Sequence, residues 1–337
     1  MKKEKWMISV ITPAYNNPDK LERFLRSVET NRTLCADALE VIVVDDSSTL
    51  DLKATTDKFK DVIYLRLEAH PGPAAARNRG AGEAKGDHLI FFDSDVILRP
   101  DTLKLFVDNF KKGEAAVAGE YDIEPAEKGY FAYFKALLTE SWTPKTKYVS
   151  VFALRAAGIT RDAFKRVGGF NEDITTASVE DFDFGERLKK AGILIAYDPA
   201  IVVQHFHPSF RKQMKLFFLR SRDWTELFLK RGGKFDNWCA SPSEGLASVS
   251  GAFFIVSIIP FLIINNRLLI ALSLASFILY VLFNIDFIKI AYKRRGLFFV
   301  PIALAIKLPL ALMVTLGFAA GIFQFVGVTF GGKAPKQ

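Results

Sequence analysis

After Ser241 the chain is largely apolar, and this tail constrains the fold more than any other feature. Three runs with at most one charged residue each, at residues 246–264, 268–285 and 297–330, are long enough to cross a bilayer core, which takes about 20 helical residues. The runs are apolar on every side rather than on one face, as membrane helices are. They therefore predict helices within a membrane, with a buried helical bundle in a soluble protein as the alternative.

The third run is too long for one simple span, and it contains Pro301, Lys307 and Pro309. Its length fits three arrangements. In the first, residues 297–306 lie in the membrane interface and residues 308–330 cross the bilayer. In the second the whole run forms one kinked helix, and in the third it forms a tight re-entrant pair.

The change in composition predicts two parts. The first is a domain at residues 1–235, whose last segment, residues 208–235, is basic and membrane-proximal, and the second is a transmembrane region at residues 241–330. Eight basic residues lie between Arg211 and Lys234, and the net charge of the chain is +8. Their position just before the apolar tail favours attraction to anionic lipid headgroups over nucleic acid. We therefore expect membrane lipids as partners and no nucleic acid.

Positive charge also predicts which side of the membrane the first domain faces. The connection after the second apolar run carries Lys289, Lys293, Arg294 and Arg295, whereas the connection before it carries only Arg267. The positive-inside rule places the more basic connection in the cytoplasm, and two spans back along the chain the first domain lies there as well. The charged N-terminus leads into only a short apolar run, so no signal peptide is expected. These features predict a multi-pass protein of the inner cell membrane with a cytoplasmic N-terminal domain.

Strand and helix signals alternate at the start of the first domain. This alternation predicts an α/β fold, with a parallel sheet covered by helices on both faces. Ligands bind such sheets beyond the carboxyl ends of the strands. The predicted strands are residues 7–12, 39–44, 62–67 and 88–92, and the predicted helices are residues 19–30, 50–59 and 73–84.

Two acidic clusters follow two of these strands, on the same rim of the predicted sheet. Asp93 and Asp95 come straight after the fourth strand, and residues two apart in an extended segment face the same side. Two close carboxylates repel each other and favour a bound cation, and hard oxygen ligands suit Mg²⁺ or Mn²⁺ beside a diphosphate. Asp45 and Asp46 end the second strand and can accept hydrogen bonds from a ribose or a base N–H. Each cluster taken alone also fits a solvated turn or a helix cap.

The clusters belong to a set of motifs that resembles the family 2 glycosyltransferases of GT-A fold. The motifs are Ser9–Asn17, Val43–Ser48, Gly72–Gly80 and Phe92–Asp95, in the order and spacing of the family. The resemblance covers about residues 7–210. It implies a Rossmann-like α/β domain with a mostly parallel sheet, followed by α-helical transmembrane segments. It also implies inverting transfer from a nucleotide diphosphate sugar, UDP- or GDP-linked, with Mn²⁺ or Mg²⁺ as cofactor.

The resemblance assigns roles to individual positions of the donor half. Asp95 is implied to ligate the metal, and Asp93 to contact both the metal and the ribose. The positions expected to hold the nucleotide are Pro13, Tyr15, Asp45, Asp46, Arg77, Asn78 and Asp93.

The segments Arg166–Glu172 and Val179–Leu188 are similar to the acceptor half of the same family. There the Gly-Gly-Phe stretch shapes the acceptor pocket, and the pair matching Glu180 and Asp181 supplies the catalytic base, by position Asp181. The chemistry agrees, because inverting transfer needs a carboxylate to take the proton of the acceptor hydroxyl. Without the upstream motifs, the same segment would be the acidic first turn of a helix.

Further candidates lie ahead of the apolar tail. His205 and His207 follow a strand-like run, and relatives use a histidine near here on the metal or diphosphate, so His205 is the expected ligand. Arg220 and Arg222 are candidates for the diphosphate, with lipid headgroups as the alternative partner. The Gln-x-x-Arg-Trp motif of processive members is matched only loosely by Leu219–Trp224, which lacks the Gln. A single sugar addition is therefore expected.

The expected acceptor is lipid-linked or lies close to the membrane, and a polyprenyl-phosphate glycosyltransferase is an alternative that the sequence does not separate from it. A membrane scaffold that had lost catalysis would lack Asp93, Asp95 or Asp181, and all three are present. A transporter is disfavoured. Its spans would be expected to contain several charged residues, and the apolar runs contain only Lys307.

Overall fold

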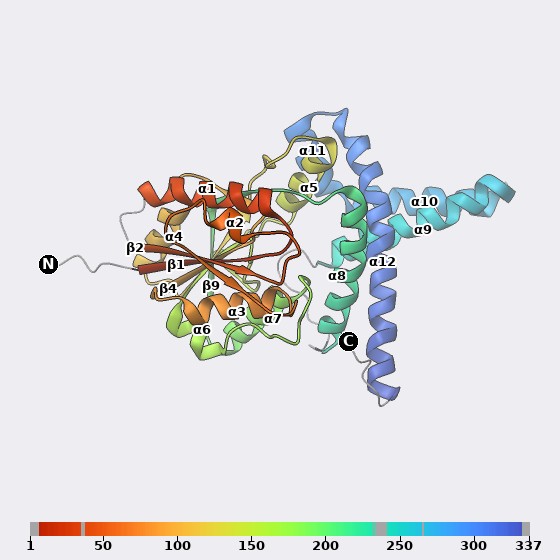
Figure 1. The fold of residues 1–337 in the computed structure, drawn as a ribbon. Helices are drawn as coiled ribbons and strands as arrows, with labels where there is room; N and C mark the ends of the chain where they lie inside the picture. The colour runs from red at the N-terminus through yellow and green to blue at the C-terminus, as the bar shows by residue number, and fades with distance from the viewer. Residues whose placement is uncertain (1–6, 35–37, 231, 233–240, 265, 332–337) are drawn as a thin grey trace. The chain divides into compact units, whose positions relative to one another are not determined.

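The chain forms two compact units in a computed structural model, drawn as a ribbon in Figure 1. The structure describes residues 7–34, 38–230, 232, 241–264 and 266–331. The first unit comprises Met1–Lys128 and Pro144–His207, and the second comprises Gly129–Thr143 and Pro208–Gln337.

This division differs from the predicted one. The sequence analysis assigned residues 208–235 to the first domain, whereas in the structure the chain after His207 groups with the apolar tail. The reason is that Phe210–Lys230 form a single helix that packs along the C-terminal helix. The predicted end of the first domain, at residues 235–240, lies outside the described residues.

One mixed sheet of nine strands forms the centre of the first unit. The strands are β1 (Met7–Ala14), β2 (Ala38–Asp45), β3 (Val62–Arg66), β4 (His88–Phe92), β5 (Val96–Leu98), β6 (Ala116–Tyr121), β7 (Tyr148–Val149), β8 (Ala156–Thr160) and β9 (Ile195–His205). Their order is β3-β2-β1-β4-β8-β6-β9-β5, with β7 beside β9. Strands β3, β2, β1 and β4 are parallel, which confirms the four strands predicted from the sequence.

The other half of the sheet contains antiparallel pairs that the sequence analysis did not predict. Strand β8 runs antiparallel to both β4 and β6, and β5 runs antiparallel to β9. The sequence of β8, Ala-Ala-Gly-Ile-Thr, is poor in the β-branched and aromatic residues that signal a strand. Gly158 is required there because a Cβ would meet the rings of Phe106 and Phe110 at 2.9 and 2.8 Å.

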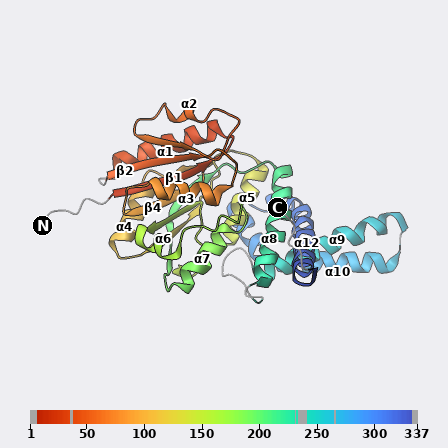
Figure 2. The same ribbon diagram turned by 60° about the horizontal axis from the view of Figure 1, so that its bottom comes forward.

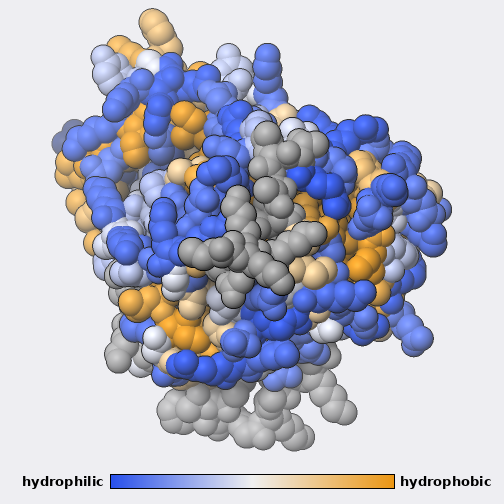
Figure 3. Space-filling view, turned by 90° about the vertical axis from the view of Figure 1, so that its left-hand side faces the viewer, coloured by the Kyte–Doolittle hydropathy of each residue, from blue (hydrophilic) through white to orange (hydrophobic). Residues whose placement is uncertain are grey.

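Helices cover both faces of this sheet. They are α1 (Pro18–Leu34), α2 (Lys53–Thr56), α3 (Pro73–Glu83), α4 (Thr102–Lys111), α6 (Arg161–Val167) and α7 (Glu180–Lys190). Helices α1 and α4 bury Leu21, Phe24 and Phe106 against one face, and α3, α6 and α7 lie on the other in Figures 1 and 2. The face drawn in Figure 3 is mostly hydrophilic with smaller hydrophobic patches, as expected of a surface in water.

Gly72 is the N-cap residue of helix α3, and its backbone lies close to another loop. Gly72 has φ +98°, and a Cβ at this position would lie 2.0 Å from the carbonyl oxygen of Thr175. We expect Gly72→Ala to destabilise the protein by about 1–3 kcal/mol, because both the backbone angle and the contact disfavour a side chain. The change in melting temperature of the purified protein measures this effect.

Gly82 provides the matched control on the same helix. A Cβ there would meet nothing within 4 Å, so Gly82→Ala should leave the melting temperature unchanged or raise it slightly. Equal melting temperatures for the two variants would show that the contact between Gly72 and Thr175 contributes nothing to stability.

The second unit consists of helices. They are α5 (Tyr130–Ser141), α8 (Phe210–Lys230), α9 (Pro242–Ile264), α10 (Arg267–Phe283), α11 (Ile285–Arg295) and α12 (Phe299–Gly331). Helices α9 and α10 lie side by side in both ribbon views (Figure 2). Phe134 of α5, Phe287 of α11 and Phe299 of α12 share a buried cluster, and Arg294 forms an ion pair of 2.6 Å with Glu140.

By length and composition, α9 and α12 are each able to cross a membrane. Helices α10 and α11 are bent by 64° relative to each other and count as a third span only if the bent pair is one broken span. The predicted run at residues 268–285 is therefore one helix of 17 residues that stops at Phe283. The run at residues 297–330 forms the single helix α12 with Pro309 inside it, so it is not a re-entrant pair.

Candidate functional site

The parallel strands β2, β1 and β4 end at one rim of the sheet. Ala14, the last residue of β1, lies opposite Asp45, the last residue of β2. Strand β4 is parallel to β1, so the segment after Phe92 leaves the sheet at the same rim. The two predicted acidic clusters are thus brought to one edge of the sheet, as the sequence analysis expected.

The loops on this rim are held by side chains in a strained backbone. Asn16 and Ser47 have φ angles of 50° and 63°, in the left-handed region that few non-glycine residues adopt. The side-chain oxygen of Asn16 accepts hydrogen bonds from the backbone N–H groups of Thr49 and Leu50, at 2.8 and 3.1 Å. The backbone N–H of Asn16 donates to Ser48 Oγ at 2.9 Å. These contacts fix the loop after β1 to the loop after β2.

Asp45 is fully buried, and its carboxylate is occupied by its own chain. Its Oδ2 accepts hydrogen bonds from Arg66 at 2.7 Å and Tyr64 at 2.6 Å, and its Oδ1 accepts one from the Ser48 N–H at 2.8 Å. Burial would raise the pKa of Asp45, but these hydrogen bonds and the charge of Arg66 outweigh it and lower the pKa below its ordinary value. In the structure Asp45 therefore holds the rim together and has no carboxylate oxygen turned to a ligand.

Asp46 belongs to a group that includes an unexpected histidine. His70 Nδ1 lies 2.8 Å from Asp46 Oδ2, and the His70 ring stacks on Tyr15 with 4.2 Å between ring centroids and 21° between planes. Burial raises the pKa of Asp46, and the neighbouring His70 offsets part of this shift. Tyr15 and His70 are both about half exposed, so the stacked pair presents a flat aromatic surface at the rim.

Asp95 lies beside His205 because of the strand pairing. Val96 of β5 is opposite His205 of β9, which places His205 Nε2 3.3 Å from Asp95 Oδ1. Lys20 of α1 lies 3.9 Å from the other oxygen of Asp95. Burial would raise the pKa of Asp95, but His205 and Lys20 outweigh it and lower the pKa. This carboxylate therefore stays ionised, as a metal ligand must be.

Asp93 is connected to the acceptor half through Arg77. The buried guanidinium of Arg77 lies 2.8 Å from Asp93 Oδ1 and 3.2 Å from Glu180 Oε1. Burial raises the pKa of Asp93, Arg77 lowers it in part, and the nearby Asp95 raises it further. One arginine thus joins a carboxylate at the end of β4 to a carboxylate at the start of α7.

The two acidic residues at the start of α7 have different surroundings. Glu180 is buried, with one oxygen on Arg77 and the other accepting a hydrogen bond from the Ser178 N–H at 2.8 Å. Asp181 is half-buried, and its Oδ1 accepts a hydrogen bond from the Phe182 N–H at 2.9 Å. Of the pair, Asp181 is the one that solvent or an acceptor can reach.

Asn78 holds a loop rather than lining the rim. Its Oδ1 accepts from the Phe170 N–H at 2.8 Å, and its Nδ2 donates to the Phe170 carbonyl and to Glu172 at 2.9 and 2.8 Å. Gly169, with φ +73°, is required beside it because a Cβ would lie 2.7 Å from the Asn78 side chain. Asn78 therefore fixes the Gly-Gly-Phe segment, and its expected contact with the nucleotide has no support in this geometry.

The remaining predicted residues have separate positions. Pro13 is half-buried on β1, and His207 Nδ1 lies 2.9 Å from His205 Nδ1. Arg220 and Arg222 are on α8 of the second unit, where Arg222 pairs with Asp223 at 2.7 Å. Within the part of the chain that the structure describes, no three His, Cys, Asp or Glu side chains are arranged as a complete metal-binding group.

Sequence reasoning missed three residues of this rim: His70, Tyr121 and Lys20. Tyr121 stacks on His205 with 4.5 Å between ring centroids and so orients it. His70 stands in the turn between β3 and α3, and turns that follow parallel strands return to the same rim, so its position could have been noticed. Tyr121 and Lys20 gave no comparable signal, because the pairing of β6 with β9 that places Tyr121, and the packing of α1 that places Lys20, were not predicted.

Comparison with known proteins gives one family over this region. Residues 9–167 match the family model "Glycosyl transferase family 2". The "Pre-mycofactocin glycosyltransferase" of Mycobacterium tuberculosis is 31% identical over 229 residues, which cover 64% of this chain and 44% of the relative. The chain therefore spans less than half the length of this relative.

Two solved structures share the fold. "Mannosyltransferase PcManGT from Pyrobaculum calidifontis in complex with GDP-Man and Mn2+" is 19% identical, with a TM-score of 0.54 over 96% of this chain and 88% of its own. "GalNAc-T7 with UDP, GalNAc and Mn2+" is 20% identical, with a TM-score of 0.50 over 62% of this chain and 44% of its own. These similarities confirm the predicted GT-A-like α/β fold.

Proposed function

The chain contains a glycosyltransferase family 2 domain, and we propose that it transfers a sugar from a nucleotide diphosphate sugar to an acceptor at the membrane surface, with inversion at the anomeric carbon. The main support for this proposal is the position of Arg77, which contacts a carboxylate on each side of the rim. It couples Asp93, on the donor side of the rim, to Glu180, which adjoins the candidate base Asp181. Donor and acceptor carboxylates are then held in one network, as a direct transfer between two substrates requires.

The stacked pair of Tyr15 and His70 supports nucleotide binding. A half-exposed aromatic surface at the end of parallel strands can stack on a nucleobase, and Asp46 fixes the His70 ring that backs it. One structural neighbour is in complex with GDP-Man and the other with UDP, and the base of each nucleotide has a face that can stack in this way.

The residues present fit a divalent cation. Asp93 and Asp95 are carboxylates close enough to raise the pKa of Asp93, and His205 adds an imidazole nitrogen beside Asp95. This mixed oxygen and nitrogen donor set suits Mn²⁺ and also admits Mg²⁺, with further ligands from the substrate diphosphate. When bound, the ion would neutralise charge that develops on the leaving diphosphate. Tyr121 and Lys20 would hold His205 and Asp95 in place.

Asp181 is the proposed general base. Its carboxylate would take the proton of the acceptor hydroxyl as that oxygen attacks the anomeric carbon and the bond to the diphosphate breaks. Glu180 cannot share this role in the observed arrangement, because both of its oxygens are engaged inside the protein. It acts instead through Arg77, by fixing the start of α7.

Donor binding tests the proposal without requiring the acceptor. Titration calorimetry with Mn²⁺ should detect at least one nucleotide from a panel of UDP- and GDP-sugars. If no member of the panel binds, with or without Mn²⁺, the rim is not a donor site and the proposed function fails.

The aromatic surface gives a sharper prediction with the same assay. Tyr15→Ala should weaken donor binding by about 1–3 kcal/mol, because a stacking partner of the base is lost. Tyr15→Phe keeps the ring and should bind the donor nearly as well as the native protein. Equal affinity of the alanine and native proteins would place the base elsewhere.

A further inference from the structure

Helix α12 is long and apolar enough to cross a membrane, but its packing partner is a charged helix. Ser221 Oγ of α8 donates a hydrogen bond to the Val314 carbonyl of α12 at 2.7 Å. Gln324 Nε2 of α12 donates to Glu226 Oε2 of α8 at 3.0 Å. The two helices therefore lie alongside each other over at least ten residues of α12, from 314 to 324.

Two glycines bring these helices into backbone contact. Gly317 and Gly321 are four residues apart and so lie on one face of α12. A Cβ on Gly317 would lie 2.3 Å from the carbonyl oxygen of Phe218, and one on Gly321 would lie 2.5 Å from that of Arg222. Small residues at this spacing allow close approach of two helices. The pairing of α8 with α12 is thus specified by sequence as well as by hydrogen bonds.

The charged residues of α8 bear on whether α12 can cross a membrane, because α8 packs along α12. Its six basic and two acidic residues are Arg211, Lys212, Lys215, Arg220, Arg222, Lys230, Asp223 and Glu226. If residues 308–330 of α12 crossed the bilayer, the charges packed along them would be taken into the hydrocarbon with them. Ionised side chains are costly there and are rare in membrane helices. The pairing therefore argues against a crossing by α12.

A polar cluster marks the place where the α9–α10 pair meets α12. The buried Lys307 of α12 lies 3.1 Å from Glu244 in the first turn of α9, and its Nζ donates to Asn284 Oδ1 at 2.6 Å, at the bend between α10 and α11. Away from this cluster, α9 and α10 project crosswise from α12 (Figures 1 and 2). Both helices expose large apolar side chains, such as Phe253 and Leu262 of α9 and Phe277 of α10. Within this unit, α12 therefore contacts α9 and α10 at the polar cluster around Lys307, and the apolar ends of α9 and α10 extend away from α12.

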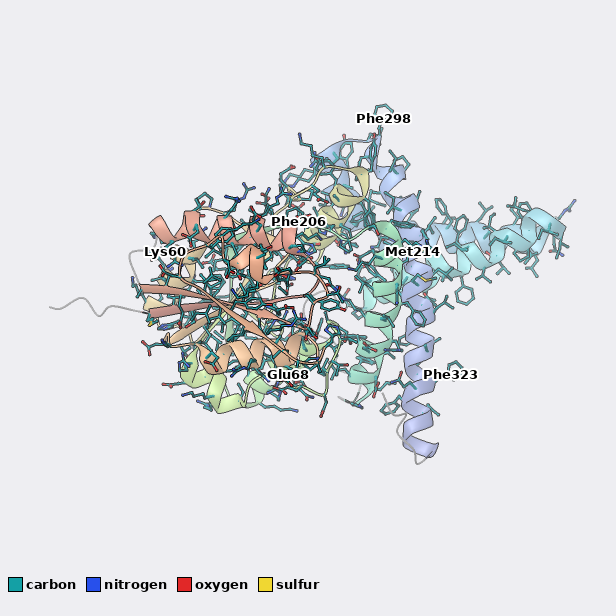
Figure 4. The ribbon with its side chains drawn as sticks, viewed as in Figure 1. Lys60, Glu68, Phe206, Met214, Phe298 and Phe323 are labelled. Atoms are coloured by element: carbon teal, nitrogen blue, oxygen red, sulfur yellow. The ribbon has the colours of Figure 1, made fainter. Side chains whose placement is uncertain are left out.

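The outer face of α12 is apolar. Leu316 and Val326 are exposed on it, and Phe323 is 78% exposed and points away from the helix in Figure 4. Together α8 and α12 form an amphipathic surface, with basic side chains on one helix and an apolar face on the other. Such a combination is typical of segments that lie in the plane of a membrane interface.

We propose that α8 and α12 form one interfacial surface that binds anionic lipid headgroups, and that only the α9–α10 pair enters the bilayer core. The basic side chains of α8 contact the headgroups, and the apolar face of α12 contacts the upper acyl chains. This inference concerns membrane placement and does not depend on the proposed sugar transfer.

The depth of α12 in the bilayer tests the proposal. Full-length protein with Cys35→Ser and Cys239→Ser would carry one nitroxide at a time, on Ile302→Cys, Leu316→Cys or Phe323→Cys, all on exposed positions of α12. The protein is reconstituted in vesicles of phosphatidylcholine and phosphatidylglycerol. Collision of the nitroxide with oxygen and with a water-soluble nickel chelate then reports depth. Phe253→Cys, at an exposed position in the middle of α9, and Lys60→Cys on the first unit provide the deep and the aqueous references.

We expect all three α12 labels at one shallow depth, between the two references. A depth maximum at Leu316, or a Leu316 label as deep as that on Phe253, would mean that α12 crosses or enters the core and would overturn the proposal. Because the labels are attached before reconstitution, poor labelling in the membrane does not confuse the outcome.

The choice of lipid is tested separately. Spin-labelled phosphatidylglycerol should associate with the native protein more strongly than spin-labelled phosphatidylcholine, and this preference should fall in Lys212→Gln/Lys215→Gln, two exposed positions of α8. Lys60→Gln/Lys189→Gln removes the same charge from the first unit and should keep the preference. Equal association of the two lipids with the native protein would contradict headgroup binding by α8.

Discussion

Asp95→Asn is expected to lower the turnover of the nucleotide sugar by about 10³-fold or more while leaving the protein folded. The substitution keeps the size of the side chain but removes the negative charge that His205 and Lys20 hold in the ionised form. Removing one preorganised electrostatic partner of a developing charge typically costs 10²–10³-fold, and loss of a metal ligand adds to this. Steady-state release of the nucleoside diphosphate with saturating Mn²⁺ measures the effect.

Asp101→Asn is the matched control for this experiment. Asp101 lies six residues further along the chain, is exposed, and makes no side-chain cap to α4 although it stands at its start. Its variant should retain native turnover and the native melting temperature. If Asp95→Asn were as active as Asp101→Asn, Asp95 would have no part in the reaction and the metal assignment would be wrong.

Asp181→Asn should lower kcat by about 10²–10⁴-fold, the usual contribution of a general base, with little change in the affinity for the donor. The separation of kcat from donor binding follows from the position of Asp181, which adjoins the Arg77 network through Glu180 but lies outside the aromatic surface at Tyr15. Measurement of kcat and of donor affinity by calorimetry on the same preparation tests both statements.

Glu186→Gln on the same helix serves as the control. Glu186 pairs only loosely with Lys190, at 3.8 Å, and its variant should be fully active. A normal kcat in Asp181→Asn would transfer the role of base to another group. A loss of donor binding equal to the loss of kcat would instead show that Asp181 positions the donor.

The parallel half of the sheet was predictable from sequence because each of its strands is a buried apolar run. Residues 39–44 and 88–92 were assigned within one residue of β2 and β4. The antiparallel strand β8 was not predictable in this way, since its small residues are selected to fit beneath Phe106 and Phe110 rather than by strand preference. The grouping of α8 with the tail could not be predicted for a similar reason, because α8 is polar in composition and joins the apolar tail through its packing on α12.

Some features of the candidate site could likewise be predicted from the sequence, and others could not. Asp93 and Asp95 can be predicted as candidate ligands because their spacing after a strand has a chemical meaning in sequence alone. Asp45 has an equal signal, yet the structure occupies its carboxylate with Arg66, Tyr64 and the backbone. Whether an aspartate such as Asp45 is available to a ligand depends on its hydrogen-bond partners. These partners come from strands and turns that are distant in sequence, and they come together only in the fold.

In the proposed function, Mn²⁺ and the carboxylates of the rim together support sugar transfer. The most direct measurement is release of nucleoside diphosphate by the purified full-length protein from a panel of UDP- and GDP-sugars, with total membrane lipid extract as acceptor and with Mn²⁺ present or removed by a chelator. We predict that one donor is turned over, that chelation abolishes turnover, and that Asp95→Asn and Asp181→Asn each lower it at least 100-fold, about the smallest loss expected for either variant. Turnover that persists in the chelator would show that the reaction needs no divalent cation, and native turnover in both variants would show that these carboxylates take no part in it.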